Sequence, residues 1–111
     1  IPNAIASVNY SRVVEYKVDE TNKTVQEVWS YGKSRGNQVF SEALSGVQYL
    51  SKTGHILFCP GMGVPTAKGR GGRIMEIDPT TNEVIFETEI TAPGTTAFHR
   101  ITRMPLYPDN F

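Results

Sequence analysis

The sequence predicts an all-β fold, and within that class a β-propeller fragment with one full four-stranded blade and parts of its two neighbours. Three observations indicate this architecture: short runs rich in β-branched and aromatic residues, turn residues between the runs, and an internal repeat with a period of about 60 residues. Hydrophobic residues make up 39% of the chain, which suits a packed core and argues against disorder.

The first half of the chain contains four predicted strands. Residues 12–18 and 24–29 flank a turn rich in Asp, Asn and Lys, so they are expected to form a hairpin. A loop over 32–45 follows the hairpin. The next two strands cover 47–50, where apolar and polar residues alternate, and 55–59, an apolar run typical of a strand buried on both faces.

The second half adds three predicted strands. A glycine-rich loop over 60–72 leads into the strands 73–77 and 83–90, which flank a second turn rich in Asp, Thr and Asn. After another loop, residues 97–103 are expected to form the final strand, which the two prolines that follow would end.

The internal repeat sets the phase of the blades. The stretch 12–28 resembles 73–87, because each reads as strand, Asx-rich turn and strand, and two further strands lie between the copies. The predicted divisions are a partial blade at 10–32, a full blade at 46–90 and a last inner strand at 97–104. A seven-stranded β-sandwich has the same strand count and is the alternative architecture.

Charge and composition exclude several function classes. Eleven basic and eleven acidic residues give a formal net charge of zero, so nucleic acid and anionic membranes are not expected partners. No apolar run is long enough for a membrane span. The basic cluster of Lys68, Arg70 and Arg73 is expected to be a solvated loop, and Cys59 a buried, inert thiol. No metal-ligand spacing is visible, and no cofactor is expected.

Four stretches of the sequence resemble a known family. Residues 10–19 (YSRVVEYKVD) lead into 24–32 (TVQEVWSYG), a phenylalanine and a serine precede the predicted strand that begins near 45, and 98–108 (FHRITRMPLYP) closes the chain. Together they are similar to the later blades of the bacterial aryl-sulfate sulfotransferases, the arylsulfotransferase family. The resemblance extends from about residue 10 to residue 108.

The resemblance implies a fold and an activity. Members are six-bladed propellers, periplasmic or exported and usually homodimeric, that move a sulfuryl group from a phenolic sulfate ester to a phenol through a sulfurylated histidine. That histidine lies upstream of the matched stretch, and neither His55 nor His99 corresponds to it. The chain is therefore expected to be a C-terminal fragment that is inactive alone, holds no catalytic residue, and needs the remainder of its own propeller.

Substrate-binding candidates lie where predicted loops reach the central channel. Hydroxyl groups there would stabilise the sulfuryl oxygens, and the resemblance implies this role for Thr96, or Thr95 with a one-residue slip, and less directly for Ser45. Ser41 ends the same loop as Ser45, and His99 lies in the terminal motif. The alternative is that the Ser and Thr residues cap turns and that His99 packs or supports a neighbour.

Two functions remain open from the sequence. The first is part of a sulfuryl-transfer enzyme acting on phenolic sulfates and phenols. The second is a non-catalytic propeller fragment that serves binding or assembly, because propellers support both classes.

Overall fold

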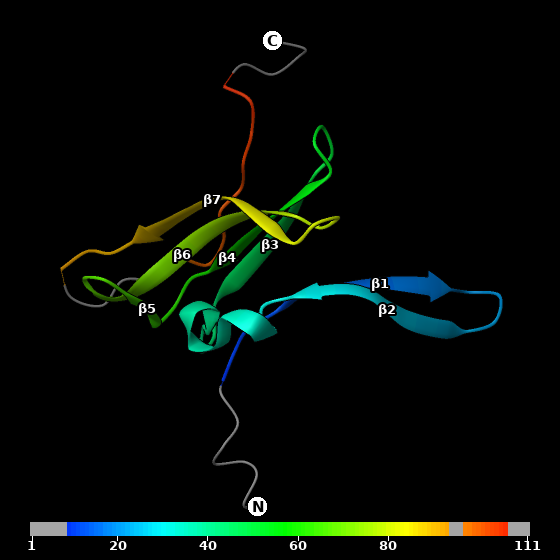
Figure 1. The fold of residues 1–111 in the computed structure, drawn as a ribbon, viewed down its shortest axis with the longest axis horizontal. Helices are drawn as coiled ribbons and strands as arrows, with labels where there is room; N and C mark the ends of the chain where they lie inside the picture. Colours follow the sequence, from blue (N-terminus) through cyan, green and yellow to red (C-terminus); the bar gives the residue numbers. More distant parts are fainter. Residues whose placement is uncertain (1–8, 94–96, 107–111) are drawn as a thin grey trace, which may run out of the picture.

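The computed structural model describes residues 9–93 and 97–106 and confirms the all-β prediction. Its elements are β1 (Val13–Asp19), β2 (Thr24–Tyr31), the 3₁₀ helix η1 (Lys33–Val39), β3 (Ser45–Leu50), β4 (His55–Pro60), β5 (Val64–Thr66), β6 (Gly69–Asp78) and β7 (Glu83–Ile90). Six of the strands match predicted ones within a few residues, and they form a two-stranded hairpin and a larger sheet (Figure 1).

The larger sheet has the topology of one propeller blade. Strands β3, β4, β6 and β7 pair in sequence order, each antiparallel to the next. The short β5 pairs with the beginning of β6 and so extends the sheet beside β4. The glycine-rich stretch expected to be a loop over 60–72 is therefore mostly strand, because β6 begins at Gly69 rather than near Arg73.

The internal repeat is visible in the backbone. The β1–β2 turn and the β6–β7 turn both place a residue with positive φ four positions after an aspartate, namely Lys23 (54°) and Asn82 (60°). In both turns the aspartate side chain, Asp19 or Asp78, accepts a backbone N–H from the turn. Both hairpins also shift register at the equivalent glutamate of the first strand. Equivalent sequence thus gives equivalent structure.

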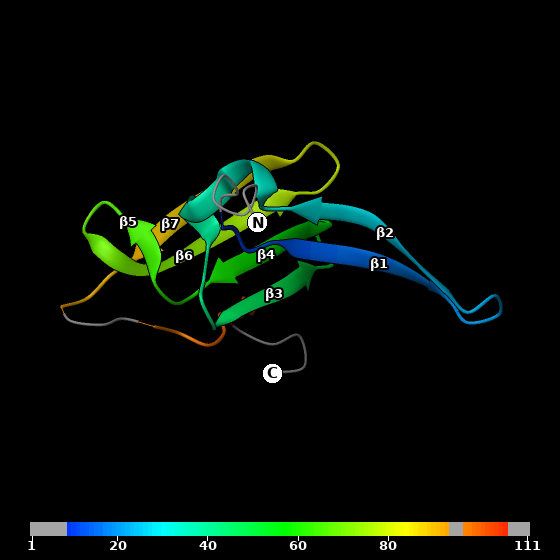
Figure 2. The same cartoon turned by 90° about the horizontal axis from the view of Figure 1, so that it is seen from below.

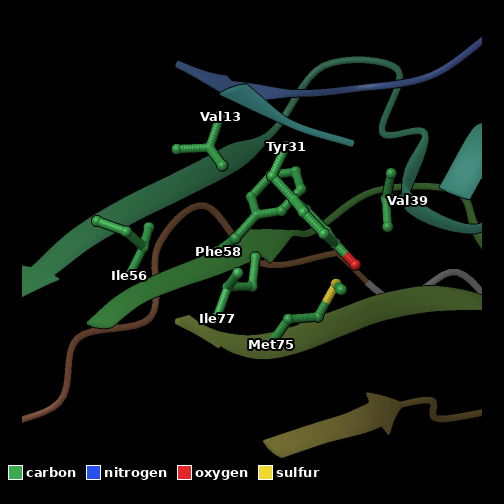
Figure 3. Packing of buried hydrophobic residues seen from close by; sticks show 7 residues of the cluster. All are labelled: Val13, Tyr31, Val39, Ile56, Phe58, Met75 and Ile77. Atoms are coloured by element: carbon green, nitrogen blue, oxygen red, sulfur yellow. The ribbon is translucent and has the colours of Figure 1, made fainter. Parts of the chain in front are cut away.

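The hairpin packs on one face of the blade. Its base lies beside β3 and β4 while its turn projects away from the sheet (Figure 2), and an apolar cluster fills the space between the base and the sheet (Figure 3). The buried members are Val13, Tyr31, Val39, Ile56, Phe58, Met75 and Ile77. Alternation along each strand explains the selection, since side chains two residues apart share a face of the sheet.

The segment 97–106 covers the opposite face, where Leu57 and Cys59 point. The expected strand at 97–103 does not form there, because the described part of this segment makes only one isolated β-bridge, between Ala97 and Met62. Its backbone is bound instead by the side chain of Gln48. A strand needs a neighbouring strand to form a ladder, and the sheet beneath offers its face rather than an edge.

Two further features differ from expectation. The loop at 32–45 contains η1, which ends in the buried Val39. Arg73 is expected in a solvated loop, but it lies within β6 and is only 8% exposed. Its guanidinium binds the Gln38 carbonyl of η1 and the Glu87 carboxylate of β7.

Exposed apolar side chains collect on the hairpin and on β3. Tyr16, Val18 and Val25 are each more than half exposed on the hairpin, and Val47 and Tyr49 are 58% and 64% exposed on β3. Together they form an apolar patch on the surface of the described residues. No helix among the described residues is long and apolar enough to cross a membrane.

Candidate functional site

A hollow of about 600 Å³ runs along the free edge of β3. It combines charged, hydroxyl and apolar side chains. Arg12 lies at the beginning of the hairpin, Ser45 opens β3, and Arg100 and Thr102 come from the C-terminal segment. Phe58 contributes to the apolar wall. Three separate parts of the chain thus meet here.

Ser45 is the predicted site residue that the structure places in this hollow. It is exposed at the first position of β3, opposite Pro60 of β4. This is a non-hydrogen-bonded pair of the antiparallel ladder, because the adjacent Gly61 N–H donates to the Leu44 carbonyl at 2.9 Å. No side-chain hydrogen bond links Ser45 to another residue that the structure describes.

Ser41 is hydrogen-bonded within the chain. Its hydroxyl donates to the carbonyl of Leu44 and accepts the backbone N–H of Met62 at 3.1 Å. Its own backbone N–H donates to the Ser11 hydroxyl at 2.8 Å. These bonds join the start of β3 to the end of β4, and they match the turn-capping alternative for this residue.

His99 is exposed and lies next to Arg100, outside the hollow's lining. Within ranges 9–93 and 97–106, no hydrogen bond or ion pair involves its imidazole. Thr95 and Thr96 lie outside the described residues, so the structure does not place them.

The two arginines of the hollow differ in their surroundings. Arg12 forms an exposed ion pair with Glu27, and this hydrogen bond raises the pKa of the Arg12 guanidinium. Arg100 makes no ion pair with any residue that the structure describes. Among the residues that the structure describes, Arg100 is thus the arginine of the hollow whose charge no carboxylate pairs.

His55, expected to be structural, belongs to an ionic cluster on the face of the sheet that the C-terminal segment covers. Its Nδ1 hydrogen-bonds one oxygen of Glu76, and the Arg103 guanidinium contacts the other oxygen at 2.7 Å. Glu76 is buried, and the bond from His55, followed by that from Arg103, lowers its pKa. Asp78 lies 4.0 Å from the second ring nitrogen. The cluster ties the C-terminal segment to the blade.

A second ionic cluster joins η1 to the outer strands. Glu87 of β7 accepts two hydrogen bonds from Arg35, at 3.0 and 2.7 Å, and one from Arg73 at 2.7 Å. These partners lower the pKa of Glu87, with the Arg35 bond the largest cause. The internal repeat could have predicted the ion pair of Arg73. Arg12 and Arg73 occupy equivalent positions, and each pairs with a glutamate of the next strand.

The structure confirms the prediction that Cys59 is a buried thiol. Cys59 is fully buried, and desolvation raises its pKa to about 11. The thiol therefore carries little thiolate near neutral pH and is a poor nucleophile. Among the described residues, no group of histidine, cysteine and carboxylate side chains is arranged to hold a metal ion.

The sequence was compared with known protein families. The profile of the arylsulfotransferase (ASST) family matches residues 2–99. The chain belongs to this family. The match covers the hairpin and the whole blade, and it confirms the resemblance found in the sequence.

Two curated relatives support the assignment. The chain is 40% identical to arylsulfate sulfotransferase AssT of Lelliottia amnigena over 93 residues, which are 78% of this chain and 15% of that protein. It is 34% identical to arylsulfate sulfotransferase AssT of Escherichia coli O6:H1 (strain CFT073) over 110 residues, 92% of this chain and 18% of that protein. The chain thus spans less than a fifth of the length of these relatives.

Proposed function

We propose that the chain is part of an enzyme that transfers a sulfuryl group from a phenolic sulfate ester to a phenol. The observation that carries the proposal is the family match over residues 2–99, together with relatives named arylsulfate sulfotransferase. A neutral net charge fits small aryl substrates better than polyanionic ones.

The proposed reaction proceeds through a histidine outside this chain. The histidine nitrogen attacks sulfur, the bond from sulfur to the ester oxygen breaks, and the donor phenol leaves. An acceptor phenol then takes the sulfuryl group from the histidine by the reverse substitution, with its proton passing to a base. Each step places negative charge on the sulfuryl oxygens, which hydroxyl and cationic groups stabilise.

The contribution of this chain is to bind rather than to react. Ser45 offers a free hydroxyl at the hollow. Thr95 or Thr96 would supply a second hydroxyl just before the terminal motif, with His99 beside it. Ser41 supports the site through the backbone, since its hydroxyl is already bonded within the chain.

The proposal includes a larger assembly. In the complete protein the blade takes part in a six-bladed ring, the protein is exported to the periplasm, and two copies associate. The exposed apolar side chains of the hairpin and β3 support the ring, because a neighbouring blade would cover them. The chain alone is expected to be inactive.

A transfer assay tests the proposal. The complete protein and the 111-residue chain are each mixed with 4-nitrophenyl sulfate and phenol, and 4-nitrophenolate release is followed by absorbance. We expect turnover that depends on phenol for the complete protein and none for the chain. Activity of the chain alone would place the nucleophile within it. An inactive complete protein would support the non-catalytic propeller. Native mass spectrometry of the complete protein tests the dimer.

A further inference from the structure

The C-terminal segment is fixed to the sheet at two points that flank Arg100. At the first, the backbone N–H of Phe98 donates to the Gly61 carbonyl at 3.0 Å, and the aromatic ring lies against Gly72. A Cβ atom at Gly72 would overlap that ring, and one at Gly61 would overlap the carbonyl oxygen of Phe98. The two glycines therefore allow the segment to lie directly on the sheet.

The second point is Arg103, which two side chains of the blade hold. The Gln48 amide binds both backbone groups of Arg103, accepting the N–H at 2.7 Å and donating to the carbonyl at 2.9 Å. The Arg103 guanidinium contacts the buried Glu76, which His55 orients from the other side. A bond to a buried carboxylate is stronger and more directional than one to an exposed group.

Arg100 lies between these points and against Gly46. A Cβ atom at Gly46 would be 3.5 Å from both Cα and Cγ of Arg100, so the two backbones are already in close approach. Arg100 lines the hollow beside Ser45 and Thr102. Its charge is uncompensated among the described residues, whereas Arg12 is neutralised by its ion pair.

The contents of the hollow match an aryl sulfate. A guanidinium provides paired N–H donors for the oxygens of a sulfate, and two hydroxyls lie beside it. The side chains of Val47 and Phe58 offer an apolar wall for an aromatic ring. We propose that Arg100 binds the sulfate group of the aryl ester, and that Gln48 and Glu76 position it by fixing Arg103.

This inference rests on the proposed sulfuryl transfer, and kinetics of the complete protein test it. In Arg100→Ala, the KM for 4-nitrophenyl sulfate is expected to rise about 10- to 100-fold, since bonds to charged groups contribute about 1.5–3 kcal/mol. Arg100→Lys keeps the charge and should recover part of the loss. Arg70→Ala is the matched control, because Arg70 is exposed in β6 and lines a different hollow.

The positioning residues have their own readout. Gln48→Ala and Glu76→Gln should raise KM several-fold with little change in kcat, and should speed hydrogen exchange in the 97–106 segment. Glu76→Asp, which keeps the charge, should recover part of the KM change. An ordinary loss of stability would lower the active fraction and kcat without this split.

The outcomes separate the two proposals. If the wild-type protein transfers sulfuryl groups and Arg100→Ala keeps its KM, the role of Arg100 is wrong while the function stands. If Arg100→Ala raises KM but the Gln48 and Glu76 variants do not, the positioning role is wrong. If the wild-type protein shows no transfer, the proposed function itself fails.

Discussion

The two faces of the blade are covered in different ways. The hairpin covers one face through an apolar cluster of seven buried residues, with few polar contacts across it. The C-terminal segment covers the other face through glycine contacts, the Gln48 amide and the Glu76 carboxylate. Burial of apolar area is strong but has no preferred direction, whereas hydrogen bonds fix positions. The first face is thus held mainly by apolar burial, whereas the second, which also buries Leu57 and Cys59, is fixed by directional bonds as well.

The largest expected effect comes from the apolar face. Phe58 is 3% exposed and lies in the middle of the cluster, so Phe58→Ala removes a buried ring and leaves a cavity. We expect a loss of about 3–5 kcal/mol in the free energy of unfolding. Denaturant unfolding of the complete protein measures it, and Ile85→Ala, an exposed apolar position on β7, is the control. Equal losses for both variants would contradict the distinction.

The ionic cluster at the outer strands should give the next largest effect. Glu87→Gln removes the carboxylate shared by Arg35 and Arg73, and we expect a cost of about 2–3 kcal/mol at neutral pH. The pKa of Glu87 is lowered in the folded state from its ordinary value of 4.5, so its contribution is present above that pH. It is lost as the pH falls through the folded pKa. The stabilities of both proteins should therefore converge as the pH falls below the lowered pKa of Glu87.

The polar face should respond to a smaller change. In Gly61→Ala the added methyl group meets the backbone of Phe98, which has no freedom to rotate away. We expect a loss of about 1–2 kcal/mol and faster hydrogen exchange confined to the C-terminal segment. In Phe58→Ala, by contrast, exchange should rise across the whole blade. Uniform exchange in both variants would show that the segment is not an independent unit.

The sequence predicted what depends on neighbouring residues. The hairpins β1–β2 and β6–β7 follow from Asx-rich turns between alternating runs, and these signals are local. The expected strand at 97–103 was wrong because a strand also needs an edge to pair with, which no local pattern reveals. The prediction that Arg73 lies in a solvated loop was wrong for the same reason, because the carbonyls of Gln38 and Pro65 that it binds belong to other segments.

The site was predicted less completely than the fold. Ser45 was named and does line the hollow, but Ser41 proved to be bonded within the chain. The sequence shows Arg100 only as one residue of the terminal motif. Its place at the hollow depends on a close approach to Gly46, which lies 54 positions earlier in the chain. Contacts of this kind are set by packing between layers rather than by periodicity.

The smallest expected effect on stability is that of replacing Arg12, which occupies the position of the repeat equivalent to Arg73. Arg12 and Arg73 each pair with a glutamate of the following strand, but their side chains are 42% and 10% exposed. Solvent screens the exposed pair, so Arg12→Ala should leave the unfolding midpoint of the complete protein unchanged within error. Arg73→Ala should lower it clearly, since it removes one bond to Glu87 and the bonds to the carbonyls of Gln38 and Pro65. Equal shifts would mean that the neighbouring blade buries Arg12, because only burial makes such a pair matter.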